Sequence, residues 1–104
     1  MKNTHINICE IDYEVVIDPR YGGGISDLRK KIIRVGGKNP KSIPNTLYHE
    51  AYECLLHERG HRYEKYENDN GGVVFVLTHS DFENLVADFI HINKQIGNIL
   101  SYFP

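Results

Sequence analysis

The sequence has few cysteines and no long apolar run, and both absences limit what the chain can be. Cys9 and Cys54 are the only cysteines among 104 residues, and they lie far apart. A secreted domain of this size that relied on disulfides would carry more of them. No stretch approaches the roughly 20 apolar residues of a membrane span, and no apolar run follows Met1 as it would in a signal peptide. We therefore expect a reduced, cytoplasmic protein with no membrane partner.

The chain also lacks a large excess of either charge. Its 12 basic and 14 acidic side chains give a net charge of −2, which does not indicate a polyanionic partner. Bases without an intervening acid gather between residues 29 and 41, and such a strip could touch phosphates. No aromatic residue alternates with them, and lysines at a solvated strand edge account for the strip better. Nucleic acid is therefore not the expected partner.

What is present fits one small globular domain. With 40% hydrophobic and 25% charged residues, the composition is that of a soluble folded protein. A length of 104 residues suits a single core, and no internal repeat or low-complexity linker divides it. We therefore treat residues 1–104 as one domain.

Alternating and apolar segments predict the strands. Residues 5–17 alternate between apolar and polar side chains, with a change of phase near Cys9 that indicates a bulge or a bend. A turn is expected at 18–24, since it combines proline with three glycines, and Tyr21 within it could line a cleft. The remaining predicted strands are 31–35 and a buried strand at 73–77, which we expect to pair with 62–67 as a hairpin.

Two segments with helical periodicity complete the fold. The first helix can be capped by Asn45 or Thr46, and Gly60 provides a stop. Its expected apolar face consists of Leu47, Tyr48, Ala51, Tyr52, Leu55 and Leu56. Thr78 is a natural cap for the second helix. Its expected apolar stripe consists of Phe82, Leu85, Val86, Phe89, Ile92, Ile96, Ile99, Leu100 and Phe103. The sequence predicts an α+β fold in which a small twisted sheet packs against two amphipathic helices.

One turn of the first helix carries a pattern of metal ligands. His49 and Glu53 are four residues apart, so they share a helix face and can reach one ion. Glu50 follows His49 directly. In the common motif with histidines at i and i+4, the glutamate at that position is the general base. Because a carboxylate is also a zinc ligand, the pattern predicts His49 and Glu53 as ligands and Glu50 as the base.

A catalytic zinc ion needs a third protein ligand and an open position for water. We predict His79, at the start of the second helix, as that ligand, which would complete a set of two histidines and one glutamate. Asp81 and Glu83 are alternatives near the same helix start. His57 is a further alternative if the ion lies along the first helix.

Segment 47–53 resembles the active helix of small zincin-like metallopeptidases that are common in phages and mobile elements. The order of elements is similar too, because a basic, apolar strand at 30–35 precedes this helix and segment 78–85 looks like the second, ligand-bearing helix. The resemblance spans roughly residues 10–92. It implies a minimal zincin-like fold with Glu50 as the base and His49 as the first ligand.

These patterns favour a zinc-dependent hydrolase that acts on a peptide or protein substrate. Zinc would lower the pKa of a water molecule in its open position toward about 7. Glu50 would accept the proton of that water and pass it to the leaving amine. The alternative is an inactive interaction module on the same scaffold, which would bind protein or nucleic acid through the basic strip at 29–41.

Overall fold

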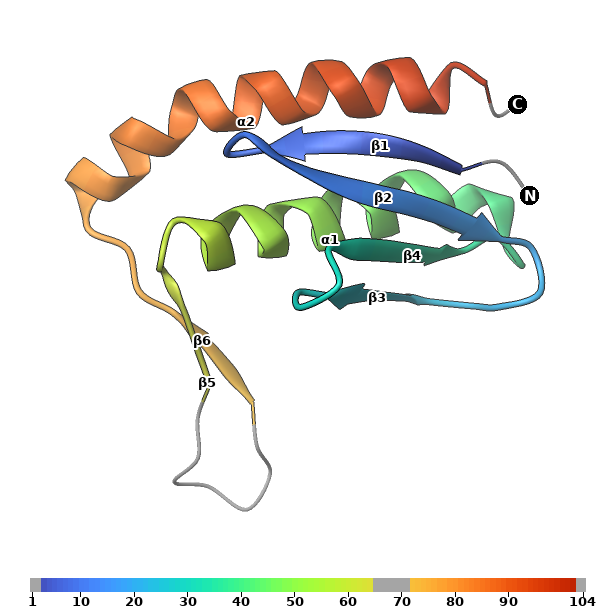
Figure 1. The fold of residues 1–104 in the computed structure, drawn as a ribbon, viewed down its shortest axis with the longest axis horizontal. Helices are drawn as coiled ribbons and strands as arrows, with labels where there is room; N and C mark the ends of the chain where they lie inside the picture. The colour runs from blue at the N-terminus through green and yellow to red at the C-terminus, as the bar shows by residue number, and fades with distance from the viewer. Residues whose placement is uncertain (1–2, 65–71, 103–104) are drawn as a thin grey trace.

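A computed structural model describes residues 3–64 and 72–102 of the chain. It forms two helices and a small mixed sheet, so the predicted α+β fold is confirmed (Figure 1). Along the chain the elements are β1 (Asn3–Ile8), β2 (Ile11–Asp18), β3 (Gly24–Asp27), β4 (Ile32–Gly36), a 3-10 turn (Pro40–Ser42), α1 (Ile43–Glu58), β5 (Arg62–Glu64), β6 (Val73–Phe75) and α2 (His79–Leu100).

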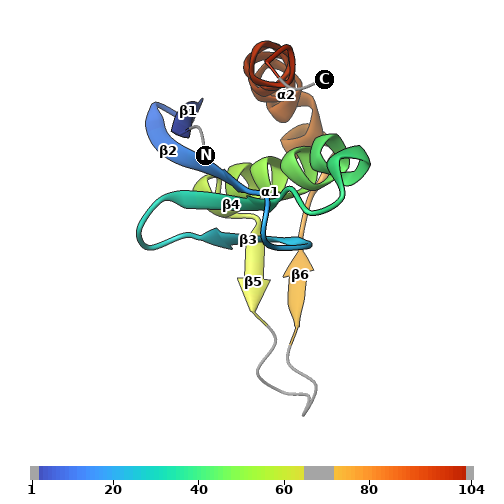
Figure 2. The same ribbon diagram turned by 90° about the vertical axis from the view of Figure 1, so that its right-hand side faces the viewer.

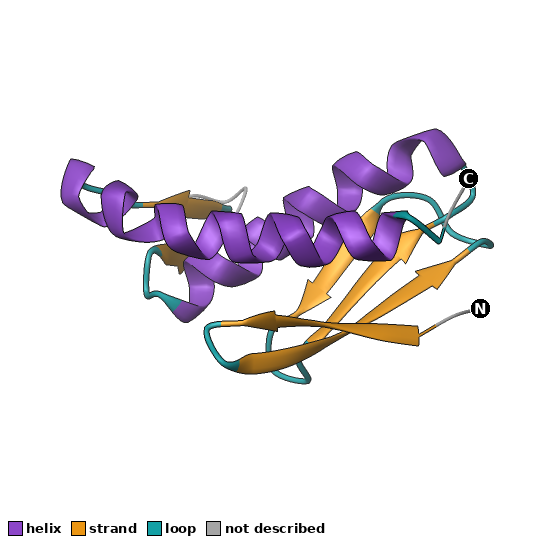
Figure 3. Cartoon of the chain, turned by 90° about the horizontal axis from the view of Figure 1, so that it is seen from above, coloured by secondary structure: helices purple, strands orange, loops and turns teal. Residues whose placement is uncertain are grey.

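The main sheet has four strands in the order β1-β2-β4-β3. The central strands β2 and β4 run parallel, whereas β1 and β3 pair antiparallel with their neighbours. The helix α1 packs on β3 and β4, and α2 packs along β1 and contacts α1. Both helices lie on one face of the sheet (Figure 3), so no helix of the described residues covers the other face.

The side chains of the central strands alternate between the two faces of the sheet. Tyr13 and Val15 of β2 and Ile33 and Val35 of β4 point to the helices and are fully buried. Arg34, between the last two, points the other way and is exposed. The core therefore lies between one face of the sheet and the helices.

The first predicted strand is in fact a hairpin. Ile8 pairs with Ile11, so only Cys9 and Glu10 connect β1 to β2. Both have positive φ angles, 53° and 66°, which is the conformation of a type I′ turn. The expected bulge or bend near Cys9 is therefore a complete chain reversal, and segment 5–17 is two strands. Pattern reading missed it because such turns usually contain Asn-Gly.

The strand β3 was not predicted, because it begins at the last glycine of segment 18–24, which reads as a turn. It forms because Gly36, at the end of β4, has no side chain and so lets the loop that leads into β3 pass close to β4. A Cβ atom on Gly36 would lie only 2.4 Å from the Tyr21 carbonyl oxygen. The Gly36 N–H also donates to the Gly23 carbonyl at 2.6 Å. The loop is thereby directed along β4, where Gly24 pairs with Val35.

The helix α1 begins at Ile43 with Ser42 at the cap position, so the predicted caps Asn45 and Thr46 lie inside its first turn. Pro44 occupies the first turn, where its fixed φ angle suits the helix and its missing N–H is not needed. The expected apolar face is confirmed: Leu47, Ala51 and Leu55 are fully buried. This packing holds α1 in one orientation against β3 and β4.

The predicted hairpin forms, but it is not buried. β5 and β6 make a separate two-stranded sheet that projects away from the helices (Figures 1 and 2). Val73 and Phe75 are 36% and 42% exposed, so the predicted burial of strand 73–77 is wrong. A continuous apolar run indicates a strand but does not supply a surface to cover it. Segment 65–71 lies outside the described residues.

The cap of α2 is as predicted. Thr78 Oγ1 accepts a hydrogen bond from the Asp81 N–H at 3.1 Å, and the Asp81 carboxylate accepts one from the Thr78 N–H at 2.9 Å. The apolar stripe is buried at Leu85, Ile92, Ile96 and Ile99 but exposed at Phe82 and Val86; Phe103 lies outside the described residues. The start of α2 extends beyond the end of α1 (Figure 1). Neither helix combines the length and apolar character of a membrane-spanning segment.

Candidate metal centre

The candidate centre lies on the side of α1 that meets β3. His49, Glu50 and Glu53 lie on α1, and Ser26 and Gly24 lie on the strand beside it. A Cβ atom on Gly24 would lie 3.2 Å from Glu50 Cγ, so the absence of a side chain there brings the strand close to the helix.

Three donor atoms converge on this part of α1. The ligand atoms of His49, Glu50 and Glu53 all lie within 4.8 Å of one another. His49 Nε2 is 3.2 Å from Glu53 Oε2 and 3.7 Å from Glu50 Oε2. The group could therefore hold a metal ion, and it contains three of the four residues predicted for the site.

These distances suit a small divalent cation. Two ligands about 2.1 Å from one zinc ion lie about 3.4 Å apart in tetrahedral geometry. The separation of 3.2 Å between His49 Nε2 and Glu53 Oε2 is close to that value. An imidazole nitrogen and carboxylate oxygens are also ligands that zinc accepts in proteins. Both the donor chemistry and its spacing fit.

Glu50 is held more tightly than its two neighbours. Its residue is only 8% exposed, and Ser26 Oγ donates to its Oε1 at 2.7 Å. The other oxygen, Oε2, is the one that faces His49. Sequence reasoning missed Ser26 because it lies on a strand that the sequence did not predict, and no motif marks it.

Glu53 has a cationic partner from the hairpin. Arg62 Nε on β5 lies 3.3 Å from Glu53 Oε1 and forms a hydrogen bond with it. The oxygen that faces His49 is Oε2, so one carboxylate meets a cation on one side and the imidazole on the other. The first residue of the projecting hairpin thus orients a candidate ligand.

A cavity of about 240 Å³ opens beside Glu50 and Glu53. It provides space for a small group next to the two carboxylates. Its lining consists of Gly24, Ile25, Ser26, Leu28, Glu50, Glu53 and Arg62.

The fourth predicted residue, His79, is not brought to this group. Its Nδ1 lies 3.0 Å from Glu83 Oε1, and its side chain is 85% exposed. With a rise of 1.5 Å per residue, His49 lies about 13 Å before the end of α1 at Glu58. His79 is the first residue of α2, which begins beyond that end (Figure 1), and it is not one of the residues whose donor atoms converge. That His79 binds the metal stays a prediction.

The other candidate ligands also lie outside the group. Asp81 caps α2, and its carboxylate is 3.9 Å from His61 Nδ1. The hydrogen bonds from Thr78 hold the pKa of Asp81 below its ordinary value. Glu83 pairs with His79, as described above. His57 lies on α1 but is not one of the three residues whose donor atoms converge.

Cys54 lies one position after Glu53 but is not a candidate ligand. It is fully buried, and burial raises the pKa of its thiol to about 11. The thiol is therefore protonated near neutral pH, whereas a metal binds the thiolate.

Comparison with protein-family models, curated proteins and solved structures finds no match for this chain. The candidate centre is therefore defined by the arrangement of its own residues: a histidine and two glutamates on one helix, a serine on the adjacent strand and an arginine on the hairpin.

Proposed function

We propose that this chain is a zinc-dependent hydrolase that cleaves peptide bonds. The observation that carries the proposal is the convergence of His49, Glu50 and Glu53 donor atoms within 4.8 Å, beside a cavity that their carboxylates line. Zinc would supply a Lewis acid that lowers the pKa of a water molecule toward about 7.

The two glutamates have different surroundings, which supports different roles. Glu53 Oε2 lies 3.2 Å from His49 Nε2, which is the separation expected of two ligands of one ion. We assign these two residues as the zinc ligands. Ser26 holds Glu50 by a hydrogen bond to Oε1. The other oxygen, Oε2, remains to accept a proton, and it faces His49. We assign Glu50 as the general base.

The strand β3 supports an extended peptide as the substrate. It is the terminal strand of the main sheet, so one edge has backbone N–H and C=O groups that no described strand pairs. Such an edge can bind an extended chain by main-chain hydrogen bonds. Because Gly24 and Ser26 of β3 line the cavity beside Glu50, a peptide there would lie next to the proposed base.

Zinc stoichiometry and affinity test the ligand assignment. We expect one zinc ion per chain in protein purified without a histidine tag. The variants His49→Ala and Glu53→Gln should weaken zinc binding by more than about a hundredfold, since losing even an indirect partner of a ligand costs 10- to 100-fold.

Glu10→Gln is the control, because Glu10 is an exposed glutamate in the turn between β1 and β2 and is not a candidate ligand. It should keep the zinc affinity of the parent. Zinc binding that survives His49→Ala would refute the ligand assignment. His79→Ala measures in the same titration whether the start of α2 supplies the third ligand.

Glu50→Gln separates the base from a ligand. With Glu50 as the base, the variant should retain zinc and lose at least about a hundredfold in kcat on a fluorogenic peptide library. If zinc affinity falls together with activity, Glu50 is a ligand and the assignment of a base is wrong.

The interaction-module alternative depends on the basic strip at 29–41, and one base of that strip is engaged within the chain. Lys31, one base of the strip at 29–41, is engaged with Glu58 at 2.8 Å, and its Nζ also lies 5.5 Å from the centre of the Tyr13 ring. It is therefore not displayed for a partner.

A further inference from the structure

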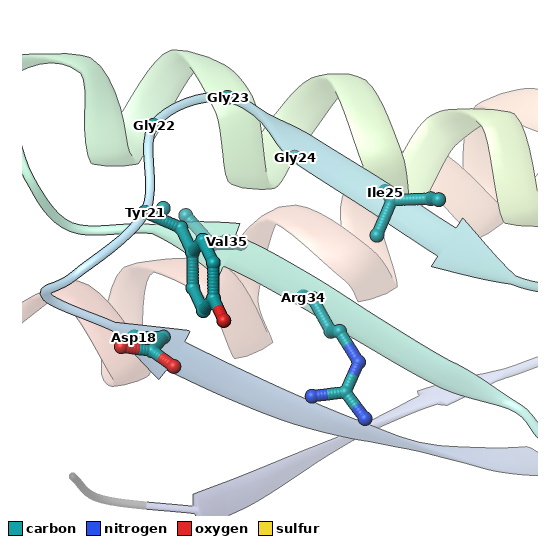
Figure 4. Close-up of a pocket in the computed structure, with 9 residues that line it drawn as sticks. Asp18, Tyr21, Gly22, Gly23, Gly24, Ile25, Arg34 and Val35 are labelled. Atoms are coloured by element: carbon teal, nitrogen blue, oxygen red, sulfur yellow. The ribbon is translucent and has the colours of Figure 1, made fainter.

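The face of the main sheet that the helices do not cover carries a second pocket, separate from the candidate centre. Its volume is about 420 Å³, within the range of about 300 to 1,000 Å³ typical of small-molecule sites. Its lining consists of Asp18, Tyr21, Gly22, Gly23, Gly24, Ile25, Arg34, Val35 and Gly36. Figure 4 shows the side chains of Tyr21, Ile25 and Arg34 on this open side of the sheet, with the helices behind it.

Tyr21 forms one wall of the pocket, and backbone hydrogen bonds fix the loop that carries it. The Tyr21 carbonyl accepts a hydrogen bond from the Lys38 N–H at 3.0 Å, and the Gly37 N–H donates to the Asp18 carbonyl at 2.8 Å. The loop also passes against Gly36, where a Cβ atom would lie 2.6 Å from the Gly22 carbonyl carbon. The Tyr21 residue is nevertheless 62% exposed, so its ring is available to a ligand.

The two charged residues of the pocket differ in their partners. Asp18 is satisfied by Arg20, whose Nε and Nη2 lie 3.1 and 3.0 Å from its carboxylate oxygens. These hydrogen bonds hold the pKa of Asp18 below its ordinary value. Among the described residues, exposed Arg34 forms no hydrogen bond or ion pair with another side chain, although its charge also helps to lower the pKa of Asp18. The pocket thus offers one guanidinium fork for a ligand.

Apolar surface lies beside that fork. Ile25 is paired with Arg34 across the strands, so the two side chains share this face, and Ile25 is 62% exposed. Val16 is the partner of Arg34 on the other side. A guanidinium with apolar and aromatic neighbours matches a planar anion that carries an apolar group. The ionised Asp18 carboxylate in the same pocket repels any anion, and it repels a dianion such as a phosphate ester more strongly than a monocarboxylate.

We infer that this pocket binds the carboxylate of an apolar C-terminal amino acid, with the carboxylate on Arg34 and the side chain between Tyr21 and Ile25. Gly24 and Ile25 line both this pocket and the cavity beside Glu50, because β3 separates the two. The pocket would thereby select peptide substrates by their C-terminal end. That role rests on the proposed function, whereas carboxylate binding does not.

Titration of the metal-free protein with N-acetyl-phenylalanine tests the inference. Amide resonances of residues 22–24 and 36 should shift in a saturable manner in two-dimensional NMR spectra. N-acetyl-phenylalanine amide has the same shape without the charge, and it should bind about ten- to a hundredfold more weakly, as expected for loss of a charge-assisted hydrogen bond. Inorganic phosphate should bind more weakly than the acid.

Arg34→Gln should weaken binding of the acid by a similar factor. Arg29→Gln is the matched control, because Arg29 is an exposed arginine outside the pocket and should retain the parent affinity. Tyr21→Ala should weaken binding by about two- to tenfold through loss of the ring. Equal binding of acid and amide, tighter binding of phosphate, or no effect of Arg34→Gln would overturn the inference.

The same variants keep this inference distinct from the proposed function. With peptide substrates, Arg34→Gln should raise KM for a free C-terminus and leave KM for the amidated peptide unchanged. If zinc binding and hydrolysis fail while N-acetyl-phenylalanine still binds through Arg34, the hydrolase proposal is wrong and the pocket assignment is supported. If hydrolysis occurs without this binding, the pocket assignment is wrong and the hydrolase proposal is unaffected.

Discussion

Ser26 and Glu50 are 24 positions apart in the sequence, yet the Ser26 hydroxyl donates a hydrogen bond of 2.7 Å to Glu50 Oε1. This contact joins β3 to α1 at the candidate centre. It also supplies a donor to a carboxylate that is only 8% exposed, and a buried acceptor without a partner costs about 1 to 3 kcal/mol. Ser26 therefore orients the proposed base.

Replacing Ser26 by alanine should separate orientation from metal binding. We expect zinc affinity within about threefold of the parent, a fall of roughly tenfold in kcat, and a loss of about 1 to 3 kcal/mol in the free energy of unfolding. Zinc titration, peptide hydrolysis and urea denaturation measure the three quantities. Ser101→Ala, which removes an exposed hydroxyl bonded to the Asn98 carbonyl, should change none of them appreciably. A Ser26→Ala enzyme with unchanged kcat would show that Ser26 is only structural.

Gly24→Ala should destabilise the fold by steric conflict with α1. The new Cβ atom would lie 2.5 Å from Thr46 Cγ2, closer than carbon atoms approach, so we expect a loss of about 1 to 3 kcal/mol. Adding Thr46→Ser removes that methyl group and should recover at least half of the loss in a double-mutant cycle. Gly22→Ala is the control, because nothing lies within 4 Å of its added atom. Strictly additive effects of the Gly24 and Thr46 changes would contradict the proposed clash.

Glu58→Gln should destabilise the protein in a pH-dependent way. Burial of the Glu58 carboxylate opposes its ionisation, but hydrogen bonds from Lys31 and Tyr13 outweigh burial and hold its pKa below the ordinary value of 4.5. A lowered pKa in the folded state stabilises the protein above pH 4.5, and that contribution is lost as the pH falls through the folded-state pKa. We expect a deficit of about 1 to 3 kcal/mol at pH 7 that shrinks below pH 4.5.

Chemical denaturation of the parent and of Glu58→Gln between pH 3 and 8 measures this difference. Glu83→Gln serves as the control, because Glu83 is 64% exposed and should change stability by less than about 0.5 kcal/mol. A deficit that is constant across the pH range would mean that the ionised carboxylate is not what stabilises this contact.

Glu10→Gly should stabilise the protein. Glu10 has a φ of 66° in the two-residue turn, where a side chain with a Cβ atom is strained and glycine is not. We expect a gain of about 0.5 to 1 kcal/mol, seen as a higher midpoint in urea. Glu10→Ala removes the same charge but keeps the Cβ atom, so it should give no such gain. Equal stabilisation by both variants would assign the effect to charge instead of to the backbone.

Much of the fold could be read from the sequence because local patterns specify it. Thr78 and Asp81 are three residues apart and form the predicted cap, and Leu47, Ala51 and Leu55 lie on the predicted face. The hairpin at Cys9 and the strand β3 were not predicted. Their residues are unusual for those conformations, and packing against neighbouring strands imposes them.

The α+β class, the two helices and the shared helical turn of His49, Glu50 and Glu53 all follow from local sequence patterns, because helical spacing is a local property. Long-range packing set the other relationships: Ser26 and Arg62 meet the two glutamates, His79 lies outside their group, and Tyr21 and Arg34 line one pocket. Those relationships join segments that are distant along the chain or set by strand pairing. They depend on how a β-sheet brings its strands together, which no short sequence pattern encodes.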